Sequence, residues 1–124
     1  MKKIALVLGS GGPKGLAHIG AIKVLQKNNI PIDYIIGTSI GSFVAAYYSL
    51  NLEVDTLEKE FRKMTKKDCR KFMDFQIPKK ALFKGEKLKA FVKRLLKNKK
   101  FSNTKIPLLI NAVDLNTGRE IIRD

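Results

Sequence analysis

The sequence predicts a three-layer α/β fold in which a parallel sheet is flanked by helices. Short apolar runs suited to buried strands occur at residues 3–8, 32–36 and 107–113, and stretches with helical apolar spacing separate them. The first two runs each end in a glycine-containing turn that leads directly into a helix, as in parallel α/β units. The chain has 124 residues, 44% hydrophobic and 29% charged, so we expect one domain with its own core.

Composition and charge limit which partners and which cellular compartment the protein is expected to have. Lys and Arg total 25 against 11 Asp and Glu, and this net charge of +14 attracts anionic membranes or nucleic acid without specifying either. No nucleic-acid-binding motif accompanies the charge, so we expect no nucleic acid partner. Cys69 is the only cysteine, which excludes an internal disulfide and favours a reducing compartment. The longest mostly apolar run, residues 35–50, is too short to span a bilayer, so we expect a cytoplasmic protein that is at most peripheral at membranes.

The first predicted strand ends in a glycine loop. Residues 9–12 read Gly-Ser-Gly-Gly, and Pro13 suits the first turn of the helix that follows. The loop therefore presents free backbone N–H groups at a helix N-terminus, a geometry that binds anions. The helix is predicted to extend to residue 28, with an apolar face made of Leu16, Ile19, Ile22 and Leu25.

Three uses of such a loop compete. A phosphate-binding P-loop needs Lys followed by Ser or Thr, but Lys14 is followed by glycine. A dinucleotide loop needs G-x-G-x-x-G, but the frame that ends at residue 15 begins with serine, and no acidic residue closes the second strand. The third use is an oxyanion hole, in which the N–H groups of Gly11 and Gly12 receive the negative oxygen of an intermediate formed at Ser39.

Ser39 is the candidate nucleophile because it lies in a G-x-S-x-G sequence at residues 37–41. The pattern joins the second predicted strand to an apolar run at residues 43–50 that predicts a helix. Gly37 and Gly41 would let strand and helix approach without a Cβ, and a strained turn would raise the serine hydroxyl above the sheet edge. The helix N-terminus also favours an oxygen that becomes negative there. These flanks favour a nucleophile elbow over a plain tight turn.

The segment that follows is helical and basic. Residues 55–58 (Asp-Thr-Leu-Glu) have the spacing of a capping box at the start of a helix. A clearer helix follows Gly85, with an apolar stripe from residue 88 to residue 96. Between Lys79 and Lys100, ten basic residues accompany the single acidic Glu86. Two interpretations stay open: a basic amphipathic helix on anionic lipid, or a helix packed on the sheet with a solvated lysine face.

The chain ends in a predicted strand, turn and strand. The run at residues 107–113 is a strand, and residues 116–118 (Asn-Thr-Gly) form the turn to a second strand at residues 120–122. Asp114 follows the first of these strands, beside the edge of the sheet where Ser39 is expected. Aspartate in such a position commonly caps a turn through backbone hydrogen bonds, which is the role that we expect here.

Two motifs together resemble the N-terminal half of the patatin-like phospholipases. They are residues 9–20 (Gly-Ser-Gly-Gly-Pro-Lys-Gly-Leu-Ala-His-Ile-Gly) and residues 31–41 (Pro-Ile-Asp-Tyr-Ile-Ile-Gly-Thr-Ser-Ile-Gly), and the pair is far more specific than either motif alone. The resemblance implies hydrolysis of lipid acyl esters by a Ser/Asp dyad, without a cofactor or a metal ion. It makes Ser39 the nucleophile and the glycine loop the oxyanion hole. Within that loop, the resemblance implies that Gly11, Gly12 and Lys14 form the oxyanion hole. Lys14 stands at a position where the family usually has Arg or Lys.

The resemblance also indicates what residues 1–124 lack. The family's catalytic Asp lies in an Asp-Gly-Gly or Asp-Gly-Ala motif, and no Asp-Gly occurs in this sequence. A triad of the α/β-hydrolase order needs a histidine after the nucleophile, whereas the only histidine, His18, precedes it and is expected to be a half-buried helix residue. We therefore expect residues 1–124 to be the N-terminal part of one patatin-like domain that is inactive alone.

Two functions follow from these observations. The first is a serine acyl hydrolase of lipid or phospholipid esters. The alternative is a non-catalytic basic module that acts at a lipid surface or in regulation and retains the elbow as scaffold. Both have a lipid as partner, and contact with an anionic membrane surface follows if the basic helix lies on lipid.

Overall fold

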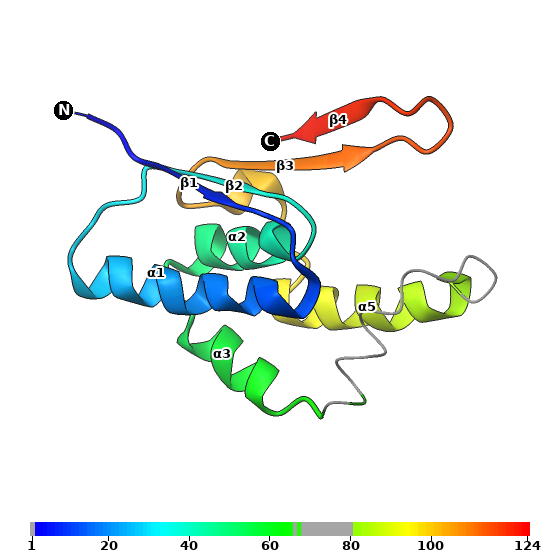
Figure 1. The fold of residues 1–124 in the computed structure, drawn as a ribbon, viewed down its shortest axis with the longest axis horizontal. Helices are drawn as coiled ribbons and strands as arrows, with labels where there is room; N and C mark the ends of the chain where they lie inside the picture. Colours follow the sequence, from blue (N-terminus) through cyan, green and yellow to red (C-terminus); the bar gives the residue numbers. More distant parts are fainter. Residues whose placement is uncertain (1, 66, 68–80) are drawn as a thin grey trace.

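Four strands form one mixed sheet along one side of the fold (Figure 1). The computed structural model describes residues 2–65, 67 and 81–124, and only the backbone of residues 81–87. Cys69 and the start of the basic segment at Lys79 lie outside these residues. The order of the strands across the sheet is β1 (Ala5–Leu8), β2 (Tyr34–Gly37), β3 (Leu108–Val113) and β4 (Glu120–Arg123).

The predicted α/β class is confirmed, but the sheet is not wholly parallel. β1, β2 and β3 run parallel, whereas β4 is antiparallel to β3. The reason is the short turn after β3, since a connection of so few residues can join only antiparallel neighbours. β1 and β2 pair with Leu8 opposite Gly37, so both strands end at the same edge of the sheet.

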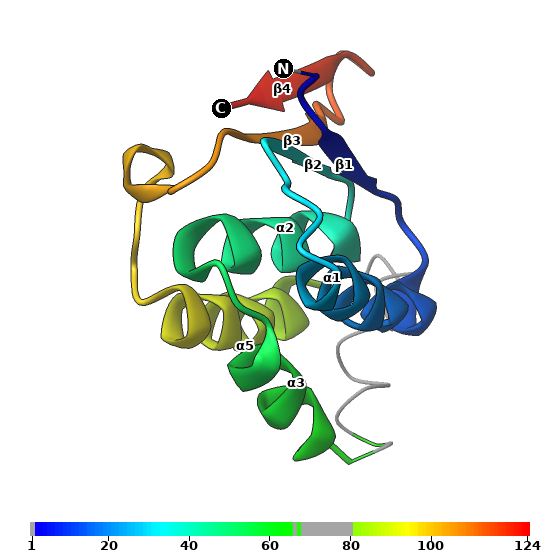
Figure 2. The same ribbon diagram turned by 90° about the vertical axis from the view of Figure 1, so that its left-hand side faces the viewer.

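The described helices lie on one face of the sheet (Figure 2). Of the predicted three layers, the second helical layer is therefore not seen in the described part of the chain. The first helix begins as a short 3₁₀ segment, a form that is frequent at helix N-termini, and Pro13 lies in its first turn as predicted. The helical elements are η1 (Gly12–Leu16), α1 (Ala17–Lys27), α2 (Ile40–Asn51), α3 (Asp55–Arg62), α5 (Ala81–Leu96) and η3 (Phe101–Asn103).

Helix α2 is the centre of the core. It contacts all three parallel strands as well as α1 and α5, and it is apolar on almost every side, as expected for a helix buried all round. Ile19 and Ile22, from the apolar face predicted for the first helix, are buried against the core. Other core residues come from the sheet, from α2 and from the start of α3: Leu8, Ile35, Val44, Ala45, Tyr48, Val54, Leu57 and Leu108.

Three phenylalanines join α2, α3 and α5 beneath the sheet. The ring centroids of Phe43, Phe61 and Phe91 lie 5.8 to 5.9 Å apart, within the range of favourable aromatic contacts. This cluster shows that α5 packs against the helical layer through an apolar face. The face of α5 that bears Phe91 is therefore packed against other helices, as the second interpretation of the basic helix predicts. The basic residues Lys89, Lys93 and Arg94 are exposed.

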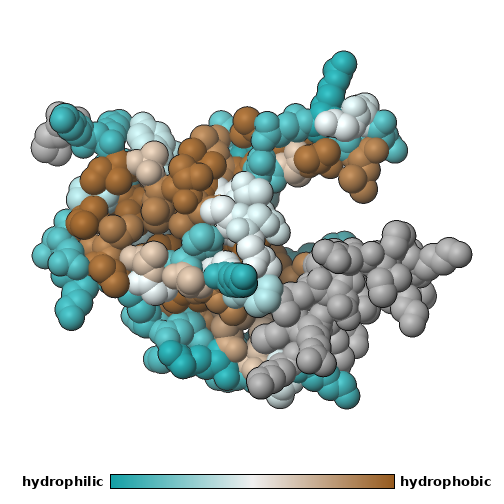
Figure 3. All heavy atoms as spheres, in the orientation of Figure 1, coloured by the Kyte–Doolittle hydropathy of each residue, from teal (hydrophilic) through white to brown (hydrophobic). Residues whose placement is uncertain are grey.

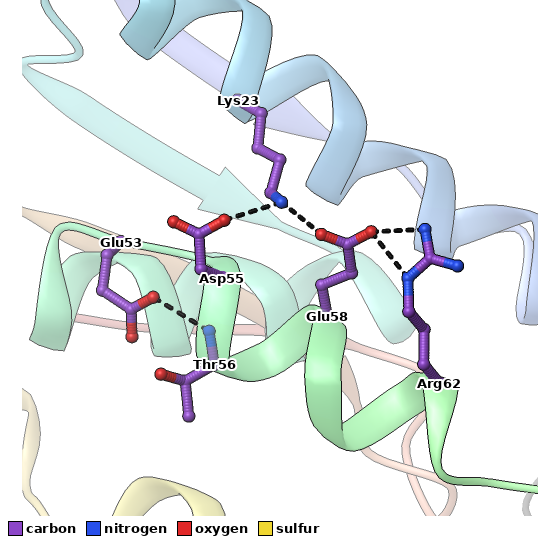
Figure 4. A network of polar contacts seen from close by, with 6 residues as sticks. All are labelled: Lys23, Glu53, Asp55, Thr56, Glu58 and Arg62. Carbon is purple, nitrogen blue, oxygen red and sulfur yellow. Dashed lines mark hydrogen bonds and ion pairs between the residues drawn. The ribbon is translucent and has the colours of Figure 1, made fainter.

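A network of ion pairs fixes α3 against α1 (Figure 4). The ammonium group of Lys23 contacts the carboxylates of Asp55 (2.6 Å) and Glu58, and Glu58 also accepts from Arg62. The predicted capping box is wrong, because Asp55 is already helical and makes no cap. The N–H of Thr56 instead donates to the carboxylate of Glu53 at 3.1 Å. The side-chain acceptor at the start of α3 is therefore Glu53, two residues before the predicted Asp55.

The sheet face opposite the helices bears apolar side chains. The strand registers place Val7, Ile36 and Leu109 on this face, and Val7 is 64% exposed. Figure 3 shows hydrophobic residues at the surface along the sheet and an open space beneath the hairpin of β3 and β4. None of the helices that the structure describes is both long and apolar enough to cross a membrane.

Candidate active site

Ser39 occupies a strained turn between β2 and α2. Its backbone has φ 55° and ψ −124°, and a positive φ is costly for a residue with a side chain. The helix begins directly afterwards, with the N–H of Ser42 bonded to the carbonyl of Ser39 at 2.9 Å. The Ser39 side chain is exposed and makes no hydrogen bond within the described residues. The structure thus has the sharp strand-to-helix turn that the sequence predicts, with the hydroxyl at the surface.

The two glycines of the G-x-S-x-G sequence are needed for close backbone packing. A Cβ on Gly37 would lie 2.4 Å from the Cα of Ser42, and a Cβ on Gly41 would lie 2.2 Å from the carbonyl oxygen of Leu8. Both distances are far below van der Waals contact. Gly37 therefore lets the chain reverse at the turn, and Gly41 lets the first turn of α2 rest on the end of β1.

The glycine loop lies against this turn, as predicted from the parallel strands. The N–H of Thr38 donates to the carbonyl of Leu8 at 3.0 Å, which joins the ends of β1 and β2. A Cβ on Gly15 would lie 2.1 Å from the Cγ2 of Ile40, so η1 packs directly against the residue after Ser39. The loop and the serine thus lie at one edge of the sheet, at the N-termini of η1 and α2 (Figure 1).

The loop residues differ in the backbone donors that they leave free. In the described part of the chain, the N–H groups of Gly11 and Gly12 have no hydrogen-bond partner. The N–H of Lys14 donates to the carbonyl of Gly11 at 3.1 Å, so this amide is not free to bind an anion. Only the exposed side chain of Lys14 is available. Sequence reasoning missed one donor, the N–H of Ile40, which has no backbone partner among the described residues and follows Ser39 directly.

His18 contacts the glycine loop. The side chain is half-buried on α1, as predicted, and its Nε2 lies 2.8 Å from the carbonyl oxygen of Gly9. This contact was not predicted from the sequence. Its signal is the spacing: His18 lies on the first turn of the α-helix that the loop leads into, close enough for its side chain to reach back.

Asp114 caps the hairpin turn, as predicted. Its carboxylate accepts from the N–H of Asn116 and from the hydroxyl of Thr117, each at 2.9 Å. These two hydrogen bonds, the one from Asn116 first, lower the pKa of the Asp114 carboxyl. A carboxylate used in this way and made less basic is poorly suited to take a proton from serine.

Comparison with known proteins identifies the family. The profile described as patatin-like phospholipase matches residues 6–123, nearly the whole chain. The chain belongs to this family. The match confirms the resemblance of the two motifs and includes both turns of the site.

Individual relatives of this patatin-like chain are lysophospholipases and related proteins. Lysophospholipase NTE1 of Coccidioides immitis (strain RS) is 57% identical over 53 residues, which are 43% of this chain and 3% of that protein. Patatin-like phospholipase domain-containing protein 6 of Homo sapiens and of Mus musculus is 30% identical over 118 residues, 93% of this chain and 9% of each relative. The patatin-like chain thus spans less than a tenth of the length of these relatives.

The candidate site of this patatin-like chain combines an exposed hydroxyl with backbone donors that are free within the described residues. The hydroxyl of Ser39 stands where the N-terminus of α2 favours negative charge. The amides of Gly11, Gly12 and Ile40 have no backbone partner among the described residues and belong to the two turns at the same edge of the sheet. Such an arrangement suits attack on a carbonyl group whose oxygen becomes negative.

Proposed function

We propose that the protein is a serine acyl hydrolase that acts on lipid or phospholipid esters. The observation that carries this proposal is the position of Ser39, exposed at a strained turn beside a loop with free amides. Membership of the patatin-like phospholipases supports the reaction class. The relatives named lysophospholipase favour a phospholipid with one acyl chain as the substrate.

In the proposed reaction the Ser39 oxygen attacks the acyl carbonyl. The carbonyl π pair moves to the oxygen, and the N–H groups of Gly11 and Gly12 bind the resulting oxyanion. The ester bond then breaks, and the serine proton is delivered to the leaving alkoxide. Water attacks the acyl-enzyme in the second half of the reaction and releases the fatty acid, and Ser39 regains its proton.

The proposed base is an aspartate outside residues 1–124. A serine hydroxyl is a weak nucleophile until a base takes its proton, and Ser39 has no such partner among the described residues. Asp114 is engaged in the hairpin turn. We therefore propose that residues 1–124 are the N-terminal part of one patatin-like domain and hydrolyse no ester at an enzymatic rate alone.

We propose that the protein is cytoplasmic and acts as a peripheral protein at an anionic membrane surface. The net charge of +14 supports this, since basic surfaces are attracted to anionic lipid. The basic side chains described at the end of α5 and after it, among them Lys93, Lys97, Lys99 and Lys100, are exposed. The same charge supports the alternative, a non-catalytic basic module at a lipid surface.

Hydrolysis of a lysophospholipid by a chain that carries the whole patatin-like domain separates the two functions. Ser39→Ala should lower kcat/KM by a factor on the order of 10⁴ or more, because the nucleophile is lost. Ser42→Ala is the matched control, since Ser42 lies in the same turn of α2 with a buried hydroxyl that has no partner among the described residues. It should keep kcat/KM within about twofold of the parent. Equal hydrolysis by parent and Ser39→Ala would refute the proposal.

A further inference from the structure

The carbonyl of Gly9 is the point where the glycine loop, α1 and the elbow meet. The His18 side chain on α1 lies 2.8 Å from the Gly9 oxygen. A Cβ on Gly41 would lie 2.7 Å from the same oxygen, so the first turn of α2 packs directly against it. The orientation of this peptide group therefore depends on both helices that follow the two turns.

The loop has few other contacts that fix its conformation. Before Gly9, the carbonyl of Leu8 accepts from Thr38, and after it the carbonyl of Gly11 accepts from Lys14. Three of the four residues from 9 to 12 are glycine, which has the largest backbone freedom. Within the described residues, His18 supplies the only side-chain hydrogen bond to this stretch. Without this bond, hydrogen bonds would hold the loop between Leu8 and Gly11 only at its ends, and the Gly9 peptide would keep only its packing against Gly41.

The chemistry of the contact fixes the role of the imidazole. A backbone carbonyl only accepts hydrogen bonds, so His18 must carry a proton on Nε2 and donate it. Among the described residues, no hydrogen bond joins His18 to the Ser39 hydroxyl, and the imidazole nitrogen that lies near the loop is engaged with Gly9. It acts on the loop alone.

We propose that His18 is a positioning residue that holds the glycine loop in the conformation that binds the oxyanion. This inference rests on the proposed function, since it assigns to the N–H groups of Gly11 and Gly12 the role described above. A loop held in place has its donors aimed before charge develops, which lowers the barrier without strengthening the binding of the uncharged ester. Loss of the contact should therefore lower kcat and leave KM nearly unchanged.

Two amide variants form a matched pair for this test. In His18→Gln the amide nitrogen is the same number of bonds from Cα as Nε2 of histidine, so it reaches the Gly9 carbonyl. In His18→Asn the same donor is one methylene shorter and falls short. Both side chains are neutral and polar, and the test includes thermal unfolding to show that the two variants are equally well folded.

The experiment measures kcat and KM for lysophospholipid hydrolysis by the parent, both variants and Ser39→Ala, each carrying the whole domain. His18→Gln should keep kcat within about threefold of the parent, and His18→Asn should lose about tenfold or more, with KM within about twofold in both. Equal kcat in His18→Gln and His18→Asn would overturn the role of His18. Activity that persists in Ser39→Ala would instead overturn the proposed function.

Discussion

At positions 37 and 41, the absence of a side chain decides whether the elbow can form. Each glycine faces backbone atoms, the Cα of Ser42 in one case and the carbonyl of Leu8 in the other. Backbone atoms of a strand or helix cannot move aside as a flexible side chain can. The strained backbone of Ser39 is thus held by the packing on both sides of it.

Gly41→Ala tests this packing against Gly20→Ala. Gly41→Ala should lower the free energy of unfolding by about 1–3 kcal/mol, because its Cβ would overlap the end of β1. Gly20 is exposed within α1, and a Cβ placed there would have no other atom within 4 Å, so Gly20→Ala should raise stability by about 1 kcal/mol through helix propensity. Denaturant unfolding measures both. Equal effects of the two substitutions would show that the elbow tolerates a side chain.

At the scale of elements, charged pairs join α3 to α1 and to α5. Lys23 of α1 lies between Asp55 and Glu58 of α3, and Glu60 of α3 contacts Arg94 of α5 at 2.9 Å. The Lys23 ammonium, followed by the Arg62 guanidinium, lowers the pKa of the Glu58 carboxyl. These pairs fix the position of α3, while Leu57 and the phenylalanine cluster supply its apolar contacts.

The ion pairs predict how stability changes with pH. Because the pKa of Glu58 is lower in the folded state, its contribution is complete above the ordinary carboxyl pKa and is lost as pH falls through the lowered value. Lys23→Gln should thus destabilise the protein at neutral pH, and the difference from the parent should vanish in acid. Lys27→Gln, on the same helix and without an ion pair in the described residues, is the control. If Lys23→Gln lowered the free energy of unfolding by the same amount in acid, Lys23 would stabilise the protein through packing and not through its charge.

The sequence was sufficient to predict most elements, because their apolar patterns are regular. The strands and α2 follow from continuous apolar runs between glycine turns, and α1 from its spaced stripe. The position of α3 was predicted correctly but its cap was not, because Glu53 before the helix competes with Asp55 as acceptor and local spacing does not decide between them. Continuous apolar strands also predicted helices on both faces, whereas the described residues place Val7 at the surface.

At the scale of the whole molecule, the parallel pairing of β1 and β2 creates the site. It brings residues 9–12 and 37–41 to one edge, which the order of elements was sufficient to predict. The engaged amide of Lys14 was not predictable, because it depends on the path of the chain between the strand and α1. The spacing of His18 indicates that its side chain can reach back to the loop, but not which group of the loop it contacts. The sequence motifs therefore predict the residues of the candidate site, and the fold determines which of their groups are free.

The most direct test of the proposed function is to react the protein with a fluorophosphonate and locate the adduct by peptide mass spectrometry. The chain should carry the whole patatin-like domain, because the proposed base lies outside residues 1–124. A fluorophosphonate reacts with an activated serine, so we expect one adduct on Ser39, retained in Ser42→Ala and absent from Ser39→Ala. An adduct on another residue, or labelling that persists unchanged in Ser39→Ala, would contradict the assignment of Ser39 as the nucleophile.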